Sequence, residues 1–137
     1  MSKGMKRGII IVLALGLAVG GFFGARLLMQ TSQYRRIISE IDIQTPDLLR
    51  VQDGTFSGSF DAILVAADVE VTVENHEIVN VNLVHHHFGR DSAADAEVVT
   101  VRVVDGQSLN VDTVAGATNS SLVILNAIQL ALESGLN

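Results

Sequence analysis

The apolar residues of the chain follow two patterns, and each predicts a different part of the molecule. From Gly8 to Gly24 the sequence reads GIIIVLALGLAVGGFFG without a charge, and Leu27 to Met29 prolong the run beyond Arg26. A helix needs about 20 such residues to cross a bilayer core. The segment therefore predicts a membrane-spanning helix, with the Arg26 side chain reaching the interface.

A cleaved signal peptide is the alternative interpretation of this segment, because three basic residues precede the apolar run at Lys3, Lys6 and Arg7. The sequence AVGGFFGARLL offers only a weak cleavage site, and the chain has no cysteine for lipid attachment. A retained signal-anchor over residues 1–30 is therefore favoured. Under both interpretations the rest of the chain is exported.

The orientation of the span follows from the basic residues at its two ends. Those before the run favour a cytoplasmic N-terminus, although Arg26, Arg35 and Arg36 follow it. We expect a single-pass protein of the plasma (inner) membrane with its C-terminal domain on the extracytoplasmic side. Residues 31–51 are polar and contain Pro46, which disfavours helix just before it. They predict a membrane-proximal stalk leading to a domain over residues 52–137.

From Asp53 onward, apolar and polar residues alternate with a period of two, which is typical of strands with one buried face. The residues expected on that face are Val69, Val71 and Val73, followed by Val79, Val81 and Leu83. Glu74 to Glu77 separate the two runs as a turn, so the pattern predicts an antiparallel hairpin. A glycine-punctuated strand around Thr55 to Ser59 is expected before it.

Two helices are expected after the strands. In the segment from Ser92 to Val104, one helical stripe would hold Ala94, Val98 and Val101. The final helix has Asn119 and Ser120 as caps and Gly135 as its stop. Its apolar residues keep the i, i+3, i+4, i+7 spacing at Ile124, Ala127, Ile128 and Ala131. Strands followed by helices predict an α+β domain, a small antiparallel sheet packed with a C-terminal helix.

Charge and cysteine content exclude several classes of function. The net charge is -6, and residues from 31 onward hold five basic and fifteen acidic residues, a formal charge of -10. An acidic domain of this kind repels phosphate backbones, so nucleic-acid binding is not expected. The absence of cysteine excludes disulfides, thiolate metal sites and thiol catalysis. A redox role would need a cofactor that does not depend on cysteine.

The sequence Asp112 to Ser121 reads DTVAGATNSS, and there the chain resembles the FMN-binding domain family. Members of this family include FMN-carrying subunits of sodium-translocating NADH:quinone reductase and of Rnf-type complexes, and small anchored proteins. The family motif is D-x-x-(S/T)-G-A-T, and Ala115 stands where serine or threonine is usual. The resemblance extends over roughly residues 52–135, through the strands, the sequence HHHFGR and the closing helix.

The resemblance implies that FMN is joined through its phosphate to the hydroxyl of Thr118, the final threonine of the motif. It also implies a secreted, magnesium-dependent flavin transferase as a partner, and a membrane oxidoreductase or quinone-linked electron donor as another. The expected function is an extracytoplasmic carrier that relays electrons in an external or membrane redox chain. We expect a carrier or a redox-complex subunit and not an enzyme with its own substrate.

The residues of the motif suit this chemistry in their own right. Gly116 and Ala117 leave room for a transferase to close on the Thr118 hydroxyl. The helix that follows offers free N–H groups that favour a phosphate, which makes Ser120 and Ser121 candidate cofactor-binding residues. Asp112 would add negative charge beside the phosphate, so recognition by the transferase or capping within the turn is the role expected for its carboxylate.

Outside the motif, His87 and Arg90 are candidate contacts to the flavin or its phosphate, since an arginine fork suits both. A metal-binding module built from His76, His85 and His87 is an alternative function. A domain that binds FMN without a covalent bond, and a purely structural domain whose acidic face meets a basic partner, are further alternatives. A strand points consecutive residues to opposite faces, so at most His85 and His87 of the triplet could share a metal.

Overall fold

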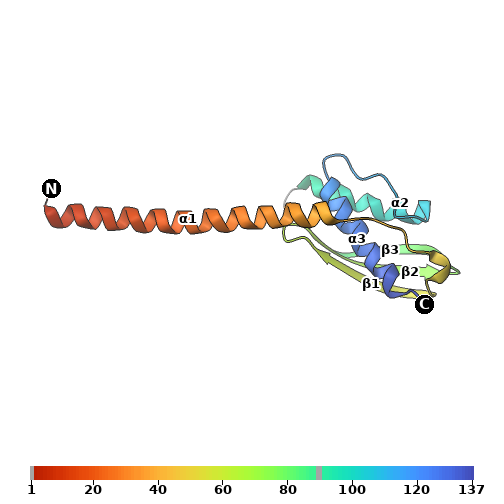
Figure 1. Cartoon of the computed structure of the whole chain (residues 1–137). Coiled ribbons are helices and arrows are strands. Elements are labelled where there is room, and N and C mark those ends of the chain that lie inside the picture. The colour runs from red at the N-terminus through yellow and green to blue at the C-terminus, as the bar shows by residue number, and fades with distance from the viewer. Residues whose placement is uncertain (1, 89–90) are drawn as a thin grey trace. The chain divides into compact units, whose positions relative to one another are not determined.

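The computed structural model describes residues 2–88 and 91–137. The elements in chain order are α1 (Lys3–Glu40), η1 (Leu48–Arg50), β1 (Gly54–Asp61), β2 (Ala66–Glu74), β3 (Glu77–His87), η2 (Asp91–Val98), α2 (Val99–Gly106) and α3 (Thr118–Ser134). The chain divides into two compact units, residues 1–33 and 34–137. Figure 1 shows the sheet and helices of the second unit.

Helix α1 has 38 residues and is long and apolar enough to cross a membrane. It continues to Glu40, through the first part of the predicted stalk, and the chain from Ile41 to Asp47 forms neither helix nor strand. The helix ends several residues before Pro46, where the sequence disfavours helix. The predicted boundaries at residues 30 and 51 stay predictions.

The domain is built on a three-stranded antiparallel sheet in the order β1-β2-β3. β2 and β3 form the predicted hairpin, and its turn holds Asn75 and His76 at φ values of 52° and 66°. Two consecutive residues in this left-handed region are typical of the tight turn that fits the twist of a hairpin. Val69, Val71 and Val73 are buried as predicted. Together with helix α3, which covers them, they confirm the α+β fold.

The prediction for the start of β3 was wrong at Val79. The pairing of β2 with β3 shifts register between Thr72 and Val73, and Ile78 occupies the buried position opposite Val73. Val79 is 44% exposed as a result. A bulge adds one residue to one strand and so reverses the inward and outward positions on either side of it. Beyond it, Val81 and Leu83 pack against the core as predicted.

The segment after the sheet is helical, as predicted, but its buried stripe was wrong. It consists of two helices of different pitch, η2 and α2, and the buried residues are Ala96, Val99 and Val103. Val98 and Val101 of the predicted stripe are 43% and 55% exposed. A 3₁₀ helix has three residues per turn, so a stripe counted at 3.6 residues per turn is out of phase where the two helices join.

Helix α3 lies against one face of the sheet through its buried apolar side, which includes the four residues predicted for it. Its closest approach to the sheet is at Gly58 of β1, where a Cβ atom would lie 2.0 Å from the carbonyl oxygen of Ala127. Eight residues after Ala127, Gly135 makes the same kind of approach, since a Cβ atom there would lie 2.7 Å from the ring of Phe56. A glycine is therefore needed at position 58 for the helix to reach the sheet.

The predicted start of this helix was wrong by one or two residues. The N-cap is Ala117 and not Asn119 or Ser120. No side chain caps the helix. The first helical hydrogen bond runs from the Ser121 amide to the Ala117 carbonyl at 2.9 Å, so helical geometry begins at Thr118. Gly135 is the C-cap, as predicted.

The contact at Gly58 predicts a large loss of stability when a methyl group is added there. Gly58→Ala should lower the free energy of unfolding by about 2 kcal/mol or more, because the helix must move away from the sheet. Pulse proteolysis of the full chain in urea measures the change. Ser57→Ala, on the exposed face of the same strand, is the matched control and should shift the midpoint little. Equal midpoints for both variants would contradict the packing described.

Candidate functional site

The motif predicted to carry the cofactor forms a loop that leads into α3. Its last residues make a tight turn in which the Ala117 amide donates to the Val114 carbonyl at 2.9 Å. Gly116 takes a φ of 80°, a conformation that favours glycine. Ala115 and Gly116 are exposed, and no atom lies within 4 Å of the position that a Gly116 Cβ would take. The turn is therefore open to solvent on its outer side.

Ser121 holds this turn from beneath. Its side chain is fully buried, and its hydroxyl accepts from the Val114 amide at 3.1 Å and donates to the Ala117 carbonyl at 2.9 Å. One side chain thus joins the first and last residues of the turn to the first turn of the helix. Ser120 is buried too. The geometry gives Ser121 a positioning role, and direct contact of either serine with FMN stays a prediction.

A second tether comes from Arg102, which the sequence analysis did not single out. This half-buried residue of α2 donates from Nη1 to the carbonyl of Asp112 at 2.5 Å. The contact spans ten residues and ends on a backbone carbonyl, so the sequence contains no signal for it. The Asp112 carboxylate is exposed and makes no hydrogen bond to the described residues. The loop is therefore held by its backbone, and the acidic side chain is left free.

Thr118 is the first residue of α3 and not, as predicted, the residue before its cap. It is exposed, and the first turn of the helix contains no acidic residue and no capping side chain. The first N–H groups of a helix have no partner within the helix and form its positive dipole end. In the described part of the chain, the amides of Thr118, Asn119 and Ser120 therefore remain available to an anion.

The packing of α3 on β1 fixes where this helix end lies. Gly135 lies against Phe56, and Ala127 and Ala131 lie against Gly58, so the helix runs toward the end of β1 as its residue numbers decrease. Asp61 at that end pairs with Ala66, which pairs in turn with His87. The N-terminus of α3 and the three histidines of β3 therefore lie at the same end of the domain (Figure 1).

The histidine triplet is divided between the two faces of the sheet. His85 and His87 are exposed, whereas the side chain of His86 is 2% exposed and packs against Phe88 in a tilted arrangement, with 4.7 Å between ring centroids. His86 Nδ1 lies 3.3 Å from Glu97 Oε1, and its Nε2 has no hydrogen-bond partner in the described structure. A buried polar atom without a partner is unfavourable by about 1–3 kcal/mol, so Nε2 is a candidate contact for a bound group.

His87 and Arg90 are the two candidate flavin contacts outside the motif. His87, predicted to contact the flavin, lies on the face of the sheet that α3 leaves uncovered, opposite Ala66. Arg90 lies outside the described residues. Alternation along β3 could not have found His86, because it continues from Val81 and Leu83 to His85 and His87, and the register shift between Leu83 and His85 turns His86 to the buried face instead.

A metal site made from His76, His85 and His87 is incompatible with the fold. His76 lies in the β2–β3 turn, whereas His85 and His87 lie at the opposite end of β3, about 30 Å away along an extended strand. Among residues 2–88 and 91–137, no group of three or more histidine and acidic residues is arranged to hold a metal ion.

Comparison with known families identifies the domain. The model of the family described as FMN-binding domain matches residues 66–133, which run from the first residue of β2 to the last turn of α3. The chain therefore belongs to the FMN-binding domain family and is a flavoprotein whose cofactor is FMN. No curated protein matches the chain.

The residues at the α3 end of the sheet fit an FMN group. The uncapped start of the helix suits its phosphate, and the open side of the Gly116 turn leaves space beside Thr118. His86 contributes a buried nitrogen without a partner at the same end of the sheet. A shallow hollow of the described surface lies elsewhere, on the uncovered face of the sheet.

The Ser121 contacts predict that its hydroxyl sets the rigidity of the motif turn. Ser121→Ala should speed amide exchange at Val114 about tenfold or more, because the Val114 amide loses its buried acceptor. Hydrogen exchange of the full chain, read by mass spectrometry on peptides covering the motif, measures this. Ser120→Ala is the control, because Ser120 is buried and its hydroxyl makes no hydrogen bond to the described residues. Similar exchange in both variants would contradict the positioning role.

Proposed function

We propose that the domain carries FMN covalently on Thr118 and relays electrons at the extracytoplasmic face of a membrane. The observation that supports this most directly is the position of Thr118, exposed at the start of an uncapped helix in a domain of the FMN-binding family. A hydroxyl acceptor for a phosphate needs access for the enzyme that modifies it and a surrounding that favours the product. Thr118 has both.

Access to Thr118 comes from the turn before it. Ala115 and Gly116 are exposed and present little or no side chain, and the position of a Gly116 Cβ has no neighbour within 4 Å. A flavin transferase can therefore approach the Thr118 hydroxyl without displacing bulky groups. Because Ser121 and Arg102 hold the loop by its backbone, the acceptor is presented in a fixed conformation.

The product would be a phosphodiester between the Thr118 oxygen and the ribityl chain of FMN. It carries a negative charge at the positive end of α3, where the helix dipole favours an anion by about 0.3–1 kcal/mol at an exposed site. The free amides of the first turn can donate to the phosphate oxygens. The first turn has no acidic side chain to oppose that charge.

The bound FMN would supply one- or two-electron redox chemistry, while the chain fixes its position and tunes its surroundings. The His86 nitrogen is the buried polar atom best suited to meet a bound group at this end of the sheet. We propose α1 as the membrane anchor, and a membrane oxidoreductase or quinone-linked donor as the source of electrons. The protein would act as a carrier or as a subunit of a redox complex.

The proposal predicts that Thr118 alone determines covalent flavin. The full chain, co-expressed with a flavin transferase, should be heavier by one FMN less one water and should stay yellow after denaturation. Thr118→Ala should be colourless and unmodified, while Thr118→Ser should keep a hydroxyl acceptor and some flavin. Thr113→Ala, five residues earlier in the same loop, is the matched control and should be flavinylated like the wild type.

Intact mass and absorbance of the denatured protein separate the alternatives. A wild type that is yellow when folded but releases its flavin on denaturation would replace the covalent carrier with a noncovalent FMN domain. A colourless, unmodified wild type, beside a transferase that modifies a control substrate, would refute FMN attachment in this chain.

A second prediction concerns the free carboxylate of Asp112, for which we propose recognition by the transferase. Asp112→Asn should lower the fraction of modified protein about tenfold or more at limiting transferase, since the charge is lost while the backbone contact to Arg102 is kept. Asp105→Asn, an exposed acid on α2, is the matched control. Full flavin incorporation in Asp112→Asn would remove this role from the carboxylate.

A further inference from the structure

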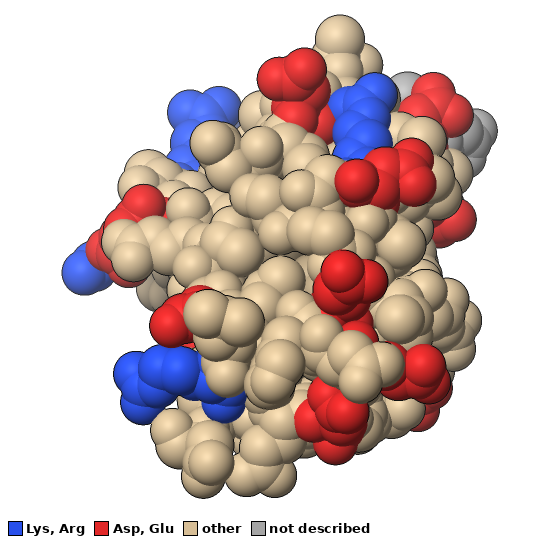
Figure 2. Space-filling model, turned by 90° about the vertical axis from the view of Figure 1, so that its right-hand side faces the viewer, with Lys and Arg blue, Asp and Glu red and all other residues tan. Residues whose placement is uncertain are grey.

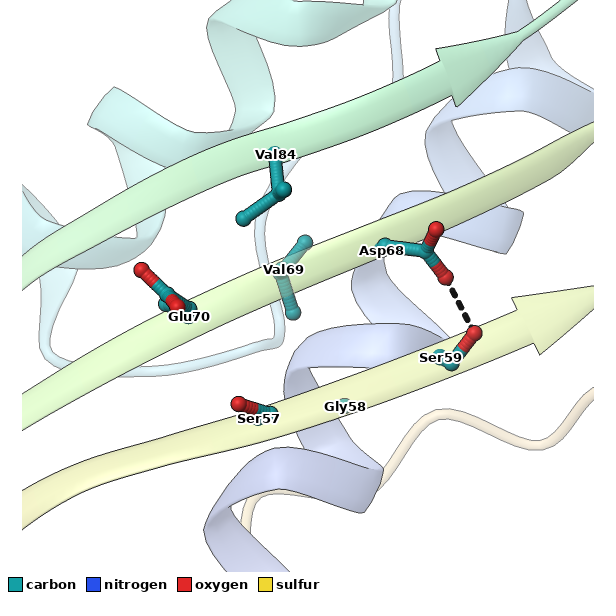
Figure 3. A pocket seen from close by; sticks show the side chains of 7 residues that line it. All are labelled: Ser57, Gly58, Ser59, Asp68, Val69, Glu70 and Val84. Carbon is teal, nitrogen blue, oxygen red and sulfur yellow. Dashed lines mark hydrogen bonds between the residues drawn. The ribbon is translucent and has the colours of Figure 1, made fainter.

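The face of the sheet opposite α3 has no element of the domain packed on its centre in the view of Figure 3. There α3 lies behind the strands, while the side chains of Ser57, Ser59, Asp68 and Glu70 stand in front. Antiparallel sheets can leave one face to solvent when its side chains are polar. This uncovered face is separate from the motif loop, which leads into the helix on the other side.

The uncovered face contains a shallow hollow of about 280 Å³ across the middle of the three strands. Its lining residues are Ser57, Gly58, Ser59, Asp68, Val69, Glu70 and Val84. Gly58 and the backbone of Val69 form the floor, because neither places a side chain on this face. Val84 is 58% exposed, in the irregular part of β3 between Leu83 and His85. Its side chain provides an apolar wall.

The charges on this face have one sign. Residues 54–87 contain no lysine or arginine. The pairing register places five carboxylates on the uncovered face, those of Asp61, Asp68, Glu70, Glu74 and Glu77. Among the residues of the three strands, only His85, opposite Asp68, and His87 could add positive charge there. Glu74 lies directly opposite Glu77, an arrangement that is unfavourable in the free domain. A cationic partner would relieve it.

We propose that this uncovered face docks a protein partner with a basic patch, and that the hollow receives an arginine or lysine side chain of that partner. The apolar stem of such a side chain can lie against Val84, as long basic side chains do on apolar surface. Its cation would meet Asp68 and Glu70, which are two residues apart on one face of β2 and so about 7 Å apart. Ser59 already donates to the Asp68 carboxylate and orients it.

The chemistry of the face favours a protein over the other charged partners available to an exported domain. Five carboxylates repel both nucleic-acid and lipid phosphates. Complementary charge, by contrast, speeds the encounter of two proteins and fixes their orientation. The proposal does not require a flavin, so it can fail while the covalent carrier stands, and the reverse is also true.

The test measures binding of the full chain, in detergent micelles, to cytochrome c used as a small basic protein. Binding should be tighter at low ionic strength than at physiological ionic strength, and acetylation of the cytochrome lysines should abolish it. Asp68→Asn combined with Glu70→Gln should weaken binding about fivefold, the size expected when two exposed ion pairs are lost. Val84→Lys should weaken it at least as much.

The matched control removes the same charge from elsewhere on the domain. Asp105→Asn combined with Glu133→Gln neutralises exposed acids on α2 and α3, and should weaken binding less than about twofold. This control is needed because acidic side chains are spread over other parts of the surface as well (Figure 2). Equal losses in the two double variants would mean attraction by net charge alone, and would overturn the proposal.

Two further outcomes would also overturn it. Unchanged binding in both Asp68→Asn/Glu70→Gln and Val84→Lys would exclude the uncovered face as the docking surface. Self-association of the full chain that Val84→Lys abolishes, found by sedimentation without any binding of cytochrome c, would assign the face to a second copy of the chain.

Discussion

The contact between Gly58 and the backbone of α3 is the constraint on which the rest of the domain depends. Any larger residue at this position would meet the carbonyl oxygen of Ala127, so the strand and the helix can approach only through a glycine. Because the same helix meets Phe56 through Gly135, its direction over the sheet is fixed at two points. This direction brings the start of the helix, and Thr118 with it, to the end of the sheet where β3 ends at His87.

The position of the helix end does not by itself fix the conformation of the motif loop. Two polar contacts hold the loop in place. Ser121 binds the two ends of the turn from within the helix, and Arg102 binds the Asp112 carbonyl from α2. Both act on backbone atoms. The side chains of the loop are therefore free for recognition and modification, while the backbone keeps one conformation. This separation of backbone and side-chain roles would suit the proposed acceptor site, which a transferase would have to recognise.

Local pattern predicted most of the fold and little of this arrangement. The valines of β2 alternate regularly, and the apolar spacing of α3 matches one helical face, so both elements could be found from the sequence. Val79 and Val101 could not be placed, because a bulge and a change of helical pitch each shift the phase of a repeating pattern. Arg102 donates to a backbone carbonyl, and every residue has one. The residue type at position 112 therefore gives no sign of this contact in the sequence.

The alternation of side chains across a strand lets one thin sheet serve two purposes. Val69 and Val71 hold the helix on one face, while Asp68 and Glu70, their neighbours in sequence, lie on the other. Substitutions on the uncovered face leave the packing of α3 intact, so that face can change its partner without moving Thr118. The proposed acceptor site and the proposed docking surface can therefore change independently of each other. That independence would suit the carrier proposed above, which would be modified by one protein and would exchange electrons with others.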